Sequence, residues 1–186
     1  MASAGLKRIL HWMFGDYHFL KVFVLDLPVS PQSLPPGITI RPIDPDDFDT
    51  SGDVGVAARM ASAGENSQGL ALYVNDDLAA VQWCWWGPRY EAERGGRSWR
   101  IPPDAAKSVA WYTLPHHRGR GYMALLSREM AALMWQRGFT RLYTRIWHSH
   151  LSSIRASRKA GWKPVGSYIE LEIGGKRLQF QLTWLR

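Results

Sequence analysis

The stretch from Ser108 to Leu126 constrains the fold more than any other part of the chain. Residues 108–114 are rich in aromatic and aliphatic side chains, which predicts a strand. A turn with two glycines and two arginines follows at 115–121, and apolar residues at helical spacing predict a helix from there to Gly138. Together with the segments around it, this strand, turn and helix predict a mixed α/β sheet.

The turn has the chemistry of a pyrophosphate cradle. Helix N-termini leave backbone N–H groups unpaired and carry a partial positive charge. Gly119 and Gly121 have no Cβ, so a phosphate can approach those N–H groups, and Arg118 and Arg120 add full charges. The turn matches neither G-x-x-x-x-G-K-[ST] nor G-x-G-x-x-G with an acid about 20 residues on, so neither of these nucleotide-binding loops is indicated.

The other segments give the order strand, helix, three strands, helix, strand, helix and two strands. Beyond the central unit, strands are expected at 37–43, 70–74, 78–86, 141–148, 162–173 and 177–184, and helices at 44–63 and 152–160. A polar loop is expected at 87–103. No stretch approaches 18 uninterrupted apolar residues, so no membrane-spanning helix is expected.

Charge supports an anionic ligand without identifying it. The net charge is +7, and residues 115–163 hold ten Lys/Arg and one acid, whereas residues 42–78 hold eight acids and Arg59 alone among the basic residues. A basic half suits nucleic acid, anionic lipid or a phosphorylated ligand. The acidic segment gives slight support to a cationic or amine acceptor. The lone Cys84 excludes an intramolecular disulfide, fits a cytoplasmic location and is expected to be buried.

Two blocks at the expected spacing resemble the GNAT (Gcn5-related N-acetyltransferase) superfamily. The first is Arg118-Gly119-Arg120-Gly121-Tyr122-Met123, preceded by Pro115. In the second, His150 stands at a position where the family often has Asn, Ser153 follows three residues later, and Lys159-Ala160-Gly161-Trp162 closes the block. The resemblance covers residues 38–186. Three residues depart from it: Met123 is bulky, His150 replaces Asn, and Ser157 stands where many members have a Tyr that protonates the thiolate.

The resemblance implies an α/β (α+β) fold, a mixed, mostly antiparallel sheet of about seven strands flanked by helices. Its central strands, 108–114 and 141–148, are expected to splay around the pantetheine arm of acetyl-CoA. No metal is expected. The implied activity is transfer of an acetyl group to the primary amine of a small molecule or peptide. The implied cofactor-binding residues are Thr113, Leu114, Arg118, Gly119, Arg120, Gly121, Tyr122, Met123 and Ser153.

Catalysis by this route needs a neutral amine, so a base or a water chain must take its proton. Strand 108–114 has no Asp or Glu, and Tyr112 and His150 are the first candidates for the base. Ser157 is the candidate at the acid position. The loop residues Glu91, Glu93 and Asp104 could also reach the site. His116 and His117 are expected to be solvated loop residues.

Residues 1–36 are expected to form an extension of a short helix, a strand at 17–27 and a Pro-rich linker, ahead of a GNAT-like domain at 37–186. Its apolar strand is expected to add to a sheet edge or to a homodimer contact, with a membrane surface as the alternative.

Three other functions remain open: a degenerate fold that binds CoA without turnover, an enzyme using a longer acyl donor, and a nucleic-acid-binding module. The last is the weakest, because the arginines form no single stripe.

Overall fold

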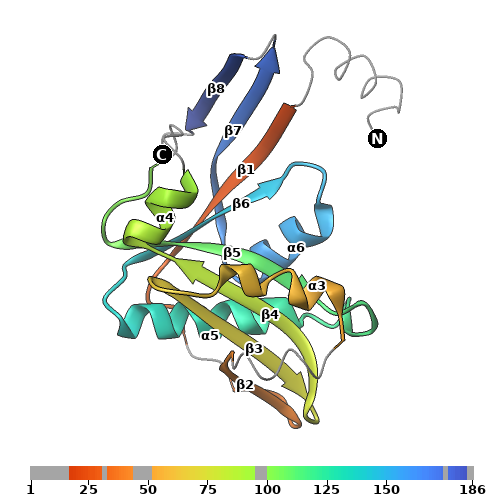
Figure 1. Ribbon diagram of the computed structural model, residues 1–186. Helices are drawn as coiled ribbons and strands as arrows, with labels where there is room; N and C mark the ends of the chain where they lie inside the picture. The colour runs from red at the N-terminus through yellow and green to blue at the C-terminus, as the bar shows by residue number, and fades with distance from the viewer. Residues whose placement is uncertain (1–16, 31–32, 44–51, 95–99, 174–175, 184–186) are drawn as a thin grey trace.

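The computed structural model describes residues 17–30, 33–43, 52–94, 100–173 and 176–183. The short helix expected in the N-terminal extension and residues 44–51 of the acidic segment lie outside these ranges. The described part is one sheet with helices on both faces (Figure 1). None of its helices is long and apolar enough to cross a bilayer.

The sheet has eight strands in the order β2-β3-β4-β5-β6-β1-β7-β8. Every neighbouring pair is antiparallel except β5 with β6, so the predicted mixed, mostly antiparallel sheet is confirmed. The strands are β1 (Tyr17–Asp26), β2 (Ile38–Pro42), β3 (Ser67–Val74), β4 (Asp77–Trp85), β5 (Ala105–Thr113), β6 (Arg141–Trp147), β7 (Lys163–Ile173) and β8 (Lys176–Thr183).

The described helices are α3 (Val54–Ala57), α4 (Gly87–Arg94), α5 (Tyr122–Gln136) and α6 (Leu151–Lys159), with short 3-10 turns η1 (Met60–Ser62) and η2 (Pro115–His117). Helix α4 corrects the expected loop at 87–103. Pro88 stands near its start, where proline is tolerated, and good helix formers follow. The long helix expected at 44–63 is reduced, in its described part, to α3 and η1.

Strand β1 lies inside the sheet, antiparallel to β6 on one side and to β7 on the other (Figure 1). Leu20 is the register partner of both Trp147 and Tyr168, and Val22 and Phe23 are fully buried. The expectation that 17–27 adds a strand at a sheet edge is therefore wrong, whereas the homodimer contact stays a prediction. A near-continuous apolar run is what a strand needs when both its faces are covered. The boundary expected after residue 36 follows β1, but β1 belongs to the same sheet as the strands of residues 37–186.

Two sets of buried side chains mark the two faces of the sheet. One core cluster joins α5 and α6 to the sheet and includes Phe23, Ala106, Leu126, Met130 and Ile154. Two smaller clusters contain Val56 of α3 and Tyr90 of α4. Successive side chains on a strand point to opposite faces, so Ala106 and Lys107 face different helix layers. The face covered by α5 and α6 is the α5/α6 face, and the face covered by α3 and α4 is the α3/α4 face.

The parallel pairing of β5 and β6 is short. It covers only the pairs Ala105 with Arg141, Ala106 with Leu142, and Lys107 with Tyr143. The Thr144 hydroxyl then donates to the Ser108 carbonyl at 3.0 Å, and no register pair follows. On its other side, β5 bulges: Trp83 pairs with Val109 but Val81 pairs with Tyr112, and Ala110 has a φ of 54°. The predicted splay therefore begins at Ser108.

We expect Phe23→Ala to lower the free energy of unfolding by about 3–5 kcal/mol, because it leaves a cavity in the core at an interior strand. Urea denaturation followed by circular dichroism would measure this loss. Asp26→Asn is the control on the same strand, since Asp26 is exposed and its ion pairs with Lys163 and Arg141 are at the surface. Equal, small effects of both changes would contradict an interior β1.

We also expect the Cys84 thiol to be unreactive in the folded protein. Cys84 is fully buried on β4, and burial raises the pKa of its thiol to about 12. The thiol therefore stays protonated at neutral and mildly alkaline pH. A disulfide reagent such as DTNB should release almost no chromophore from native protein and one equivalent after unfolding in guanidinium. Rapid reaction of the native protein would contradict the buried position.

Candidate acyl-transfer site

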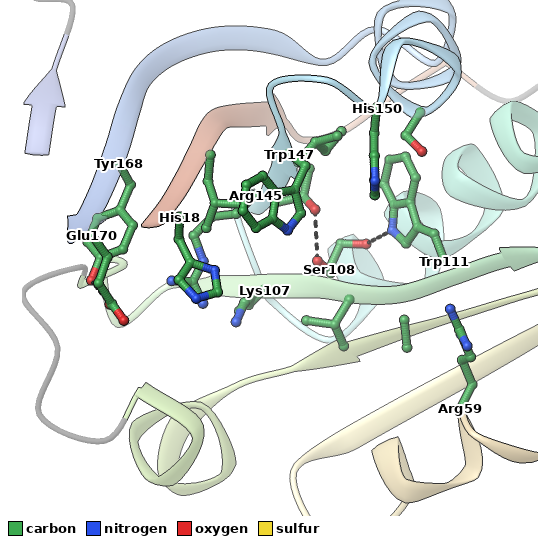
Figure 2. A pocket seen from close by; sticks show the side chains of 16 residues that line it. His18, Arg59, Lys107, Ser108, Trp111, Arg145, Trp147, His150, Tyr168 and Glu170 are labelled. Atoms are coloured by element: carbon green, nitrogen blue, oxygen red, sulfur yellow. Dashed lines mark hydrogen bonds between the residues drawn. The ribbon is translucent and has the colours of Figure 1, made fainter. Parts of the chain in front are cut away.

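A pocket of about 380 Å³ opens where β5 and β6 diverge (Figure 2). Ser108–Trp111 of β5 line one wall, and Thr144–Trp147 of β6 line the other. Figure 2 shows Glu170, Tyr168 and His18 at one end of the pocket, His150 with Trp111 at the other, and Ser108 between them. The pocket is therefore built around the splay.

The pocket connects the two faces of the sheet. His18 and Glu170 are register partners on β1 and β7, and Leu20 pairs with Tyr168, so these four side chains share the α3/α4 face. The other end belongs to the α5/α6 face. There Trp111 packs edge-on against Trp162 with ring centroids 5.7 Å apart, and His150 and Ser153 come from the start of α6. A molecule in the splay can thus reach both faces.

Charged side chains form a network at the α3/α4 end. Lys107, only 6% exposed, pairs with Glu93 of α4 at 2.6 Å, and Arg145 approaches the other oxygen of Glu93 at 3.5 Å. The Lys107 ammonium also lies 5.7 Å from the Trp85 ring centroid. Of the three loop acids considered from sequence, Glu93 reaches the site, where it forms ion pairs with Lys107 and Arg145. Glu91 is exposed, and Asp104 binds the Thr140 hydroxyl at the start of β6.

Glu170 is the acidic side chain that lines the pocket, and the sequence reasoning missed it. It is 6% exposed and accepts hydrogen bonds from the Tyr168 hydroxyl at 3.0 Å and from Gln179 at 3.2 Å. Tyr168 and Glu170 are two residues apart on β7, so they point to the same face. A spacing of two residues is common in strands, so it gave no signal in the sequence. The position of β7 beside the pocket depends on β1, which lies between β6 and β7.

His150 lines the pocket, as expected for a candidate catalytic residue. It is the N-cap of α6, where its backbone carbonyl accepts from Ile154 N–H, and its exposed side chain makes no cap hydrogen bond. Ser153 also lines the pocket, one turn into α6. The second sequence block thus brings both residues to the splay. Its closing Trp162 donates to the Ser127 hydroxyl of α5 at 2.9 Å, which ties α5 to β7.

Tyr112 and Ser157 do not line the pocket. The Tyr112 hydroxyl donates to Asp53, the N-cap of α3, at 3.3 Å, and Arg59 lies 4.8 Å from its ring centroid. Desolvation and the bond to Asp53 raise the pKa of Tyr112, so it is a poor base at neutral pH. Ser157 is fully buried, and its hydroxyl donates to the Ile154 carbonyl. Tyr112 packs on the α3/α4 face, and Ser157 is buried in α6 on the α5/α6 face.

The glycine turn has the backbone shape expected of a cradle. Gly119 and Gly121 have φ values of 79° and 83°, which glycine adopts without strain. Gly121 is the N-cap of α5, and its carbonyl accepts from the N–H groups of Ala124 and Leu125. The N–H groups of residues 119–123 precede these donors, as expected for the unpaired start of a helix. A Cβ at either glycine would meet no atom within 4 Å, so the turn opens outward.

The side chains around the turn differ in their availability to a ligand. Met123 is 9% exposed and packs in the core with Leu126 and Met130, so its bulk points away from the cradle. Arg118 and Arg120 are exposed, but Arg118 folds back and donates to the Thr113 carbonyl at 3.1 Å. The Tyr122 ring is partly buried and lies 5.9 Å from the His117 ring.

Thr113 and Leu114, which the resemblance placed beside pantetheine, lie outside the pocket, and their contact with the donor stays a prediction. The Leu114 N–H donates to the Ala79 carbonyl at 3.0 Å, and Thr113 is the register partner of Ala80. The strand residues that do line the pocket are Ser108–Trp111, nearer the splay. A bulge shifts the alternation of β5 at this point, and a bulge leaves no clear mark in the sequence.

No protein-family model matches the sequence, and no curated protein matches it. Solved structures are similar in fold. A GNAT-family protein from Novosphingobium aromaticivorans has a TM-score of 0.59 at 22% identity, over 85% of this chain and 65% of that one. A GCN5-related N-acetyltransferase from Sphaerobacter thermophilus has a TM-score of 0.57 at 14% identity, over 98% and 58%. A tandem GNAT protein from the clavulanic acid biosynthesis pathway has a TM-score of 0.57 at 13% identity, over 99% and 60%.

The chain spans 58–65% of the length of these three structures. Their likeness extends over 85–99% of this chain. The chain therefore has the fold of the GCN5-related N-acetyltransferases.

Proposed function

We propose that the protein transfers an acetyl group from acetyl-CoA to a primary amine by direct attack of the amine in a ternary complex. The observation that carries this proposal is the position of the glycine turn. It follows β5, and α6 follows β6, so both helix N-termini lie at the end where these two parallel strands have separated. A donor held by its pyrophosphate at the turn can then extend its arm into the splay.

The donor would lie on the α5/α6 face. The N–H groups of residues 119–123 would bind the pyrophosphate, and Arg120 would add charge. The pantetheine arm would pass Trp111 and Ser153 and place the thioester between β5 and β6. Ala110 and Trp111 fall where the β4–β5 register shifts. Their N–H groups are therefore candidates to stabilise the tetrahedral oxyanion.

The acceptor amine would approach from the α3/α4 face, where Glu170 lines the pocket. A buried carboxylate there can take the proton of an ammonium group and leave a neutral nucleophile. His150 lies at the opposite end, beside the donor, and can give a proton to the departing CoA thiolate. These roles replace those expected of Tyr112 and Ser157, which are engaged elsewhere.

A second candidate function is CoA binding without turnover. The burial of Ser157 and the engagement of Tyr112 support it, because they remove the expected acid and one expected base from the pocket. Release of free CoA thiol in a screen of amines separates the two functions. The buried Cys84 adds no background to such an assay.

We expect Gly121→Glu to weaken acetyl-CoA binding by about tenfold or more, because it puts a carboxylate at the phosphate position; tenfold corresponds to about 1.4 kcal/mol. Isothermal titration calorimetry would measure this loss. Gly138→Glu is the matched control: Gly138 follows the other end of α5, has a φ of 90°, and is equally open to a Cβ. Backbone strain is therefore similar in both variants. Equal affinities for the two variants would refute the cradle.

We expect Glu170→Gln and His150→Ala each to lower kcat by about 100-fold or more, with small changes in the KM for acetyl-CoA. Raising the pH should restore much of the rate of Glu170→Gln, because the amine then loses its proton to solvent. The same change should not restore His150→Ala, which lacks an acid. Each variant is thus a control for the other. A rise in KM without loss of kcat would show a binding role instead.

A further inference from the structure

Two histidines and an aspartate converge beside the glycine turn, outside the pocket. Asp77 begins β4 directly after the β3–β4 turn, and His116 and His117 form η2 between β5 and the cradle. Asp77 Oδ2 lies 2.7 Å from His117 Nε2 and 3.3 Å from His116 Nε2. The ligating atoms of the three side chains all lie within 4.8 Å of one another. The expectation that both histidines are solvated is wrong for His117, which is 5% exposed.

These distances are close to those of a divalent metal site. Zn²⁺ binds imidazole nitrogen and carboxylate oxygen at about 2.0–2.2 Å, so tetrahedral ligands lie about 3.3 Å apart. The distance of 3.3 Å from His116 to Asp77 has this value, and the distance of 2.7 Å from His117 to Asp77 is shorter. An ion would replace the two contacts to Asp77, and side-chain rotation would bring the three ligands around it. Two histidines with one carboxylate leave further positions open for water.

The chemistry of each side chain agrees with this geometry. Two imidazole nitrogens and a carboxylate oxygen are ligands that Zn²⁺ binds in proteins. The two imidazoles present the same nitrogen, Nε2, to the same oxygen. Asp77 and His116 are about 60% exposed at their side chains, so an ion can enter from solvent. His117 supplies the buried, rigid side of the cluster.

We propose that Asp77, His116 and His117 bind a divalent transition metal ion, with Zn²⁺ the best match to this donor set. The ion would join the β3–β4 turn to η2. The His117 N–H already donates to the Leu114 carbonyl, and the Arg118 N–H donates to the Pro115 carbonyl. A metal at this point would therefore fix the segment that leads into the cradle. Its role is structural and does not depend on the proposed acyl transfer.

Calorimetric titration of Zn²⁺ into chelator-treated, tag-free, full-length protein tests the site. We expect one equivalent to bind with a dissociation constant in the micromolar range. The other ring nitrogen of His117, Nδ1, is buried and has no hydrogen-bond partner among the residues that the structure describes. A ligand without such support binds about 10–100-fold more weakly. Replacement of Zn²⁺ by Co²⁺ should give a visible absorption band. The absence of saturable binding would overturn the proposal.

Variants locate the ion. His116→Ala and Asp77→Asn should each weaken Zn²⁺ binding at least about tenfold, because each removes a ligand. His18→Ala is the matched control, since His18 is also exposed but lies in the pocket. Zn²⁺ should raise the Tm of the wild type and of His18→Ala, because it binds only the folded state, but should not raise that of His116→Ala. Equal binding by all three variants would place the ion elsewhere and refute the site.

Discussion

The separation of β5 from β6 is the constraint on which the rest of the candidate site depends. Two neighbouring parallel strands normally share a continuous ladder, but here the ladder ends after three register pairs. The Thr144 hydroxyl closes the junction by donating to the Ser108 carbonyl, and the bulge at Ala110 bends β5 away. Both strands remain held on their outer sides, β5 by β4 and β6 by β1. The pairing of each strand with its outer neighbour therefore holds β5 and β6 apart.

Local patterns in the sequence were enough to predict the parts of the fold that are made by consecutive residues. The turn at Arg118–Gly121, helix α5 and the start of α6 lie close to where the motifs placed them. Their geometry depends on left-handed glycines and helix ends, which sequence spacing specifies directly. The start of α6 brings His150 and Ser153 to the pocket, and their roles there stay predictions. Helix α4 was missed because its polar residues resemble those of a loop.

The parts that could not be predicted depend on contacts between distant segments. Strand β1 has an apolar pattern that fits several positions in a sheet, and nothing in that pattern names β6 and β7 as its neighbours. Without the placement of β1, Glu170 could not be assigned to the pocket. Tyr112 and Ser157 were assigned to the site from their sequence positions, but the bulge of β5 and the packing of α6 direct their side chains elsewhere.

The interior position of β1 also restricts the order in which the protein can fold. During synthesis the apolar strand β1 leaves the ribosome well before its partners β6 and β7. The sheet from β2 to β5 can pair as it emerges, since its contacts are between consecutive strands. The nascent chain must therefore carry an unpaired apolar strand until β6 and β7 have been made. Such a segment is a target for chaperones and a source of aggregation, and the final insertion of β1 is expected to limit the folding rate.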